Sequence, residues 1–227
     1  MSVAEIYEER AAFSFEVFPP KTDVGMEKLC GEGGVLEKLY TLNPDYISCT
    51  YGAGGGTSAH TVNIAADLKK KYDVTVLTHL TCVSSTREHV AKMVQKYKEN
   101  GIENILALRG DIPEGGAPHS DYHYAAELVR DIKSQGDFCI GGACYPEGHV
   151  EAANKTEDIL HLKEKVEAGC EFLTTQMFFD NNIMYNFLYR IREKGITVPI
   201  IAGIMPVTNV NQIKRITSMS GTYLPER

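Results

Sequence analysis

The chain has 227 residues, of which 43% are hydrophobic and 23% charged, and its formal net charge is −7. This composition predicts one globular domain with a sizeable core, while the negative charge argues against nucleic acid as the main partner. No apolar stretch is long enough to span a membrane, and the polar, acidic start has no signal-peptide pattern, so we expect a cytoplasmic protein.

Apolar runs that end in polar, glycine or proline residues recur along the chain at intervals of roughly 30 residues, the length of one βα unit. They predict strands at 13–18, 45–51, 75–82, 104–108, 138–145, 172–179 and 200–206. Segments with helical periodicity lie at 87–100, 122–135, 159–168, 182–194 and 211–219. Several helices are followed by a glycine, as expected for C-caps: Gly101, Gly136, Gly169 and Gly195.

Alternating strands and helices imply a parallel sheet. About seven or eight such units favour an α/β fold of the TIM (β/α)8 barrel type over an open sheet, in a single domain that covers residues 1–227. Barrel strands carry chemistry at their C-terminal ends, and these ends are polar in otherwise apolar surroundings. The polar residues at these ends are Glu16, Thr50, His79, Arg109, Asp111, Tyr145, Gln176 and Asp180.

Glu16 differs from the others because it lies within the apolar run 13–18, which ends at Pro19 and Pro20. Burying a charge without a partner costs roughly several kcal/mol or forces protonation. A protonated carboxyl group is what a general acid requires, so Glu16 is a candidate general acid. The alternative is a strand-end glutamate that caps a backbone group or forms a salt bridge.

The six cysteines include no CxxC pair, and four of them fall in predicted strands. We therefore expect reduced thiols rather than disulfides or zinc ligands. Glu147 and His149 are of metal-binding types, but no third ligand stands at a suitable spacing, so no metal site is expected. The glycine-rich turns at 52–56 and 115–116 match neither the dinucleotide-binding pattern nor the P-loop pattern.

Six ordered motifs connect the chain with a known family. They are SFEVFPPK at 14–21, TYGA at 50–53, THLTC at 78–82, ALRGD at 107–111, YPEGH at 145–149 and TQMFFD at 175–180. With these motifs, residues 12–225 closely resemble the bacterial methylenetetrahydrofolate reductase family. The resemblance implies a flavin-containing (β/α)8 barrel that reduces methylenetetrahydrofolate to methyltetrahydrofolate with NADH or NADPH, in a ping-pong sequence through FAD.

The resemblance also implies roles for single residues. Reduction of the folate requires its five-membered ring to open by protonation of a nitrogen, and the family motif gives this general-acid role to Glu16. Asp111 would lie near the flavin as a second catalytic group, and Gln176 would join Glu16 and Asp111 in binding folate. The implied FAD-binding set is Thr50, His79, Arg109, Asp111, Tyr145, Asp158, His161 and Lys165.

The sequence departs from the family pattern in three places. The family usually has Asn at the position of His161, and an aromatic residue that holds folate or nucleotide at the position of Ile216. The chain also stops before the family's last helix and eighth strand, so a shortened or partner-dependent flavin-binding module without independent turnover is the alternative to an active enzyme. The expected partners are folate, NADH in preference to NADPH, and a second copy of the chain or another subunit.

Overall fold

The computed structural model describes residues 1–51, 58–112 and 120–225. Its internal contacts divide the chain into two compact units, Met1–Gly141 (unit 1) and Gly142–Arg227 (unit 2). The glycine-rich turns at 52–56 and 115–116 lie outside the described residues. That the chain forms a single domain stays a prediction.

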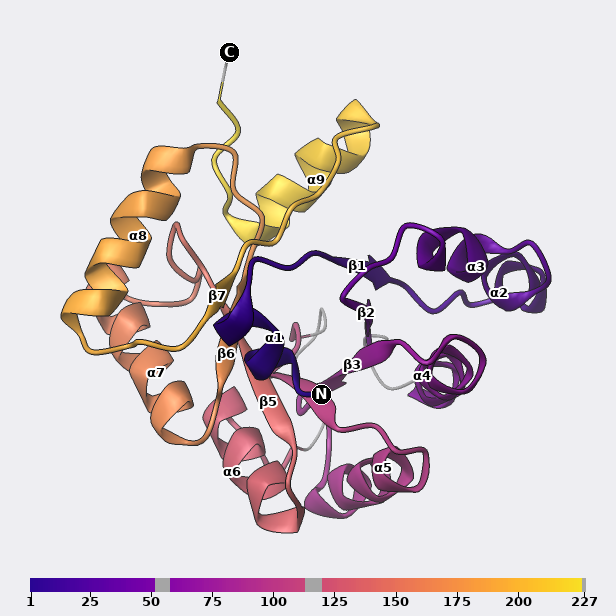
Figure 1. The fold of residues 1–227 in the computed structure, drawn as a ribbon. Coiled ribbons are helices and arrows are strands. Elements are labelled where there is room, and N and C mark those ends of the chain that lie inside the picture. Colours follow the sequence, from indigo (N-terminus) through magenta and orange to yellow (C-terminus); the bar gives the residue numbers. More distant parts are fainter. Residues whose placement is uncertain (52–57, 113–119, 226–227) are drawn as a thin grey trace. The chain divides into compact units, whose positions relative to one another are not determined.

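Strands and helices alternate in both units (Figure 1). Unit 1 contains α1 (Val3–Glu9), β1 (Ser14–Val17), α2 (Asp23–Cys30), α3 (Val35–Tyr40), β2 (Tyr46–Cys49), α4 (Ser58–Tyr72), β3 (Thr75–Thr81), α5 (Arg87–Glu99), β4 (Asn104–Leu108) and α6 (Ala125–Gln135). Strand β5 (Cys139–Cys144) begins in unit 1 and ends in unit 2. Unit 2 continues with α7 (Lys155–Glu167), β6 (Phe172–Thr175), α8 (Asn181–Glu193), β7 (Ile200–Ile201) and α9 (Val210–Ser220).

The strands are neighbours in the order of the chain, from β1 to β7. In unit 1, β1, β2, β3 and β4 pair in parallel, and the N–H of Cys139 in β5 donates to the carbonyl of Glu103 beside β4. In unit 2, β6 pairs in parallel with β7, and the N–H of Gln176 donates to the carbonyl of Cys144 at the end of β5. The predicted parallel α/β class is confirmed. The described residues contain seven strands, one fewer than a complete (β/α)8 barrel.

Helix α5 shows how local sequence forms these elements. Thr86 caps its start, because the threonine side chain accepts a hydrogen bond from the backbone N–H of His89. Gly101 follows its end with φ +64°, a left-handed conformation that glycine adopts without strain. The buried side chains repeat at helical spacing and face the core of unit 1: Val90, Met93, Val94 and Tyr97.

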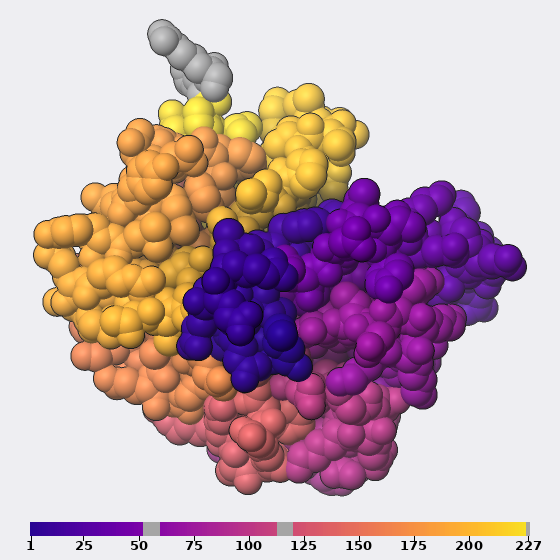
Figure 2. All heavy atoms as spheres, viewed as in Figure 1, coloured from indigo at the N-terminus to yellow at the C-terminus, as the bar shows by residue number. Residues whose placement is uncertain are grey.

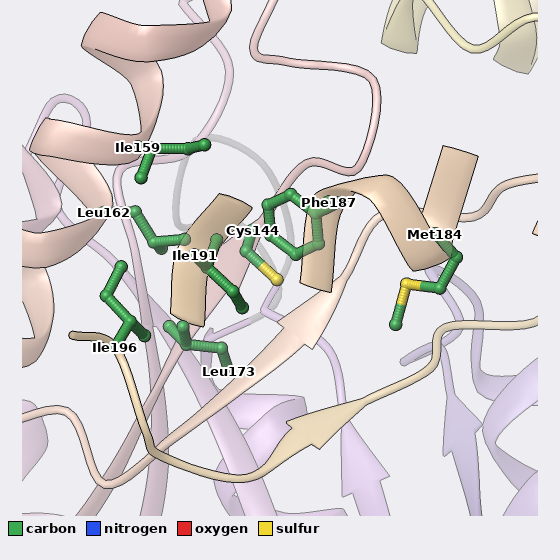
Figure 3. Close-up of a cluster of buried hydrophobic side chains, with 8 residues drawn as sticks. All are labelled: Cys144, Ile159, Leu162, Leu173, Met184, Phe187, Ile191 and Ile196. Carbon is green, nitrogen blue, oxygen red and sulfur yellow. The ribbon is translucent and has the colours of Figure 1, made fainter. Parts of the chain in front are cut away.

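Unit 2 has its own hydrophobic core, formed by the end of β5, by α7, β6 and α8, and by the chain after α8 (Figure 3). Its buried members are Cys144, Ile159, Leu162, Leu173, Met184, Phe187, Ile191 and Ile196. Figure 2 shows α9 at the surface, in yellow, where it buries Ile213 and exposes Val210 and Met219. The core therefore fixes α7 and α8 more extensively than α9.

Two strands end earlier than predicted, at points where side chains, rather than the carbonyls of a neighbouring strand, accept hydrogen bonds from backbone N–H groups. Strand β6 ends at Thr175 rather than at 179, because the next free N–H, that of Met177, donates to the side-chain Oε1 of Gln176. Strand β7 ends at Ile201 rather than at 206, and the N–H of Gly203 donates to the hydroxyl of Thr175. The apolar pattern continues beyond both points, so it overestimates the strand length.

Helices α1 to α4 are not among the predicted helices. Ser2 and Glu5 nevertheless form a capping box at the start of α1: the Ser2 hydroxyl accepts from Glu5 N–H and the Glu5 carboxylate accepts from Ser2 N–H. Gly101, Gly169 and Gly195 have positive φ, as C-capping glycines should. Gly136 does not, because its φ of 169° is extended backbone that any residue adopts.

The six cysteines are thiols, of which five are buried and Cys30 is half-buried. No helix within 1–51, 58–112 or 120–225 is long and apolar enough to cross a membrane. The same described ranges contain no group of three His, Cys, Asp or Glu side chains able to hold a metal ion.

Candidate functional site

Three polar side chains meet on the first three strands of unit 1. The parallel register places Glu16 in β1 opposite Ser48 in β2, so both side chains are on the same face of the sheet. His79 in β3 reaches the same place: its Nε2 atom lies 2.8 Å from the Ser48 hydroxyl oxygen and 3.4 Å from the Oε2 atom of Glu16. We call these three residues the Glu16 cluster.

Burial determines the charge state of this cluster. His79 has an 8% exposed side chain, and burial lowers its pKa to about 4, so the imidazole is neutral near pH 7. Burial also raises the pKa of Glu16, because the protein around the carboxyl group disfavours its charged form. An uncharged histidine does not offset this effect as an imidazolium would. The cluster therefore favours a carboxyl group that keeps its proton to higher pH than an ordinary glutamate.

Glu16 is less enclosed than the sequence predicts. Its side chain is 44% exposed, and the neighbouring Phe13 and Phe18 are exposed as well. Only Val17 in β1 is buried. The carboxyl group is thus partly desolvated but open to solvent on one side, and a substrate can reach it.

The other predicted site residues of unit 1 follow the strands β2 and β4. Thr50 is half-buried, its N–H donates to the carbonyl of Val17 and its carbonyl accepts from the Thr61 hydroxyl. Arg109 is half-buried and Asp111 is exposed, on either side of Gly110, whose φ of +87° makes a turn that glycine favours. These residues lie just beyond strand ends, as predicted.

Unit 2 places Tyr145 and Gln176 beyond the ends of β5 and β6. Both side chains are half-buried. The Tyr145 ring contacts the His149 ring edge-to-face, with the ring centroids 4.7 Å apart. The Oε1 atom of Gln176 accepts from Met177 N–H at 2.9 Å, and its amide nitrogen has no hydrogen-bond partner among the residues described. This amide group is available to donate to a ligand.

Helix α7 carries the remaining predicted residues, Asp158, His161 and Lys165, at spacings that bring them to neighbouring positions on the helix surface. Asp158 is half-buried. The His161 ring is 52% exposed and lies 3.8 Å from a Glu157 oxygen and 3.6 Å from a Glu164 oxygen. The His161 ring therefore lies beside two carboxylates on the surface of its own helix.

Lys165 is directed into unit 2. Its Nζ atom donates to the carbonyl of Ala143 at 2.6 Å, and burial lowers the pKa of this lysine. Gly142 makes room for it: a Cβ atom on this glycine would come within 3.2 Å of the Lys165 side chain and 3.1 Å of the Cys170 sulfur. The space beside the small residues of β5 is therefore filled by the protein itself.

Ser48 is the site residue that the sequence analysis missed. It is the polar member of the otherwise apolar segment Tyr46–Cys49, and it precedes Thr50 by two residues. Alternation along a strand places residues two apart on the same face, which was the available signal. The partner of Ser48 is 31 positions away in β3, so sequence spacing alone did not connect Ser48 with His79.

Comparisons with known proteins give a consistent result. The family profile described as methylenetetrahydrofolate reductase matches residues 2–227. The 5,10-methylenetetrahydrofolate reductase of Pectobacterium carotovorum subsp. carotovorum is 40% identical over 225 residues, which cover 99% of this chain and 73% of the relative. The probable methylenetetrahydrofolate reductase (NADH) of Oryza sativa subsp. japonica is 37% identical over 245 residues, which cover 99% of this chain and 41% of the relative.

Among solved structures, an uncharacterized protein from Clostridium thermocellum that binds two copies of 5-methyl-5,6,7,8-tetrahydrofolic acid superposes with a TM-score of 0.69. The superposition covers 98% of this chain and 76% of the other, at 13% sequence identity, so it shows a shared fold. The profile match and the identity over nearly the whole chain are the stronger findings. The chain belongs to the methylenetetrahydrofolate reductase family.

Proposed function

We propose that this protein reduces 5,10-methylenetetrahydrofolate to 5-methyltetrahydrofolate, with FAD as its cofactor and NADH as the hydride donor. Membership of the reductase family supports the folate reaction, and the name of the rice relative supports NADH. The observation that carries the proposal is Glu16, a carboxyl group with a raised pKa beside an uncharged His79. The thiol cysteines favour a reducing compartment, and the proposed location is the cytoplasm.

Glu16 would act as the general acid. The carbon that receives the hydride becomes electrophilic when the five-membered ring opens, and a ring nitrogen must be protonated for this to happen. Glu16 holds that proton on its carboxyl group because burial disfavours the carboxylate. The amide group of Gln176 would hydrogen-bond the pterin, and the carboxylate of Asp111 is the second polar group proposed for the substrate.

Several residues fit FAD by their chemistry. Arg109 can pair with a phosphate group, the half-buried Tyr145 has an aromatic ring, and Thr50 offers a hydroxyl group next to β2. FAD, when bound, would accept hydride from NADH and deliver it to the folate in separate half-reactions, a ping-pong sequence. The exposed Asp111 and the half-buried Asp158 are the other polar residues that we propose for the FAD site.

Three members of the expected FAD set fit less directly. The Nε2 atom of His79 faces Ser48 and Glu16, and the Nζ atom of Lys165 donates to a backbone carbonyl. His161 is exposed between two carboxylates. These side chains keep contacts within the protein, so we assign direct cofactor contact first to Thr50, Arg109 and Tyr145.

A spectroscopic titration tests the proposal. The purified 227-residue protein is examined by visible absorbance, then given NADH without oxygen, and then methylenetetrahydrofolate. A flavin spectrum that bleaches with NADH and recovers with folate is the expected result, and NADPH in place of NADH measures the nucleotide preference. Bleaching without recovery would instead support a flavin-binding module without turnover. Colourless protein would contradict the FAD assignment.

A further inference from the structure

The Glu16 cluster contains a side chain with no assigned role. Ser48 is only 4% exposed, and its hydroxyl oxygen lies 2.8 Å from Nε2 of His79. The same nitrogen is 3.4 Å from the Glu16 carboxyl group. A neutral imidazole nitrogen is either a donor or an acceptor and has one direction for a hydrogen bond in the ring plane. Of these two contacts the one to Ser48 is shorter, which indicates that Nε2 forms its hydrogen bond with the Ser48 hydroxyl group.

The titratable groups near Glu16 in the described part of unit 1 are uncharged. His79 on β3 contacts its carboxyl group and Tyr46 on β2 lies on the same face of the sheet, while Cys49 lies on the opposite face of β2. Burial raises the pKa of Cys49 to about 12 and also raises the pKa of Tyr46, so both are neutral near pH 7. His79 is thus the neighbour whose protonation would change the field at Glu16 most directly.

We propose that Ser48 and His79 are positioning residues for the general acid: the Ser48 hydroxyl donates to Nε2 of His79, keeps the ring neutral with its proton on Nδ1, and thereby keeps Glu16 a carboxylic acid. The geometry carries this inference, because the register fixes Ser48 opposite Glu16, and Nε2 of His79 on β3 lies 2.8 Å from the Ser48 hydroxyl oxygen and 3.4 Å from the Glu16 carboxyl group. The effect of this hydrogen bond on catalysis rests on the proposed function, whereas its effect on the protonation of His79 and Glu16 does not.

Loss of the Ser48 hydroxyl has a defined consequence. A buried Nε2 atom without its donor is left with an unpaired lone pair. The nearest group that can supply a proton is the Glu16 carboxyl group, and proton transfer from it would produce an imidazolium beside a carboxylate. Opposite charges at this distance stabilise each other, so Glu16 would lose its proton at lower pH than in the wild type.

The protonation part is tested by NMR on the purified protein, without any turnover. Nitrogen-15 shifts of His79 distinguish the Nδ1–H tautomer, the Nε2–H tautomer and the imidazolium, and the carbon-13 shift of the Glu16 carboxyl group follows its titration. We expect the Nδ1–H tautomer in the wild type. In Ser48→Ala we expect imidazolium near neutral pH and a Glu16 midpoint lower by about one pH unit or more.

The catalytic part is tested by the pH dependence of methylenetetrahydrofolate reduction. The wild-type rate should fall as pH rises through the Glu16 pKa, because the general acid loses its proton. In Ser48→Ala this fall should move to lower pH, with kcat at neutral pH reduced about tenfold or more and KM for folate nearly unchanged. Ser48→Thr, which keeps the hydroxyl, should restore the wild-type profile.

Two further variants keep the test decisive. Ser48→Cys has nearly the same size but a weak donor, and it should resemble Ser48→Ala if the alanine variant does not fold. Ser85→Ala removes another buried serine, whose hydroxyl donates to the backbone carbonyl of Thr81, and it should leave the pH profile unchanged.

An Nε2–H tautomer in the wild type, or a Ser48→Cys pH profile equal to that of the wild type, overturns the proposal. Coupled titration without any turnover would contradict the proposed function alone.

Discussion

The polar site residues of unit 1 and those of unit 2 are held in different ways. In unit 1, the side chains of Glu16, Ser48 and His79 come from neighbouring parallel strands and contact one another. In unit 2, Lys165 and His161 come from one helix; Lys165 donates to a backbone carbonyl, and His161 lies beside two carboxylates of its own helix. The first group is a connected cluster, whereas the second is a set of separate contacts.

The difference follows from the elements that carry the residues. Adjacent strands lie about 4.8 Å apart, and their register leaves little freedom in where the side chains of one face meet. A helix separates its side chains around a cylinder, so each is either buried or exposed according to its position. Mutations should therefore change protonation in unit 1 and mostly local stability in unit 2.

The largest effect is expected from Glu16→Gln, which keeps the shape of the side chain but removes its acidic proton. Methylenetetrahydrofolate reduction should slow by about 10²- to 10⁴-fold, while reduction of the flavin by NADH continues. Stopped-flow absorbance separates the two half-reactions. Glu8→Gln, at an exposed position on α1, is the matched control. Full folate reduction by Glu16→Gln would exclude this residue as the general acid.

Acid should destabilise the wild type through His79. Its pKa is lowered from 6.5 to about 4 in the folded protein, so the unfolded chain binds the proton first as the pH falls. The neutral His79 ring therefore contributes to the free energy of unfolding above pH 6.5. This contribution, up to about 3 kcal/mol, is lost as the pH falls through about 4.

Urea unfolding at about pH 7 and about pH 4 measures how much the free energy of unfolding decreases with acid. In His79→Gln this decrease should be smaller than in the wild type by up to about 3 kcal/mol. His123→Gln replaces an exposed histidine of unit 1 and is the control. Equal acid sensitivity of the wild type and His79→Gln would show that the imidazole is not buried in its neutral form.

In unit 2, Lys165→Met should lower the free energy of unfolding by about 1–3 kcal/mol, because the carbonyl of Ala143 loses a charged donor. Lys163→Met on the same helix removes only an exposed ion pair, 3.7 Å from Glu167, and should cost less than about 0.5 kcal/mol. Denaturant titration compares the two variants. Equal losses would mean that the Lys165 contact is no stronger than a surface ion pair.

The smallest effect is expected from His161→Asn. The ring is half-exposed beside two carboxylates, so its removal should change the free energy of unfolding by less than about 0.5 kcal/mol. The adjacent Leu162→Ala should cost about 2–4 kcal/mol, because Leu162 is part of the buried core of unit 2. A loss in His161→Asn as large as that in Leu162→Ala would place the histidine in a structural contact.

Much of the fold could be predicted from local patterns. β4 was predicted at its observed bounds, and α5 and α8 to within one residue at each end, because apolar periodicity and capping signals coincide there. The helices before β3 were not predicted. Strand lengths failed where side chains such as Thr175 and Gln176 accept backbone N–H groups. The contact of Thr175 with Gly203 joins residues 28 positions apart, which only the folded chain brings together.

The sequence by itself determined the parallel α/β class, the family, and the placement of polar residues at strand ends, because these follow from periodicity and ordered motifs. Only the tertiary structure decided what those residues contact. It brought Ser48 and His79 to Glu16 across two strand pairs, and it directed Lys165 to the carbonyl of Ala143. The physical reason is that burial and distance set the charge state and hydrogen bonds of each group, and both depend on packing between segments far apart in the chain.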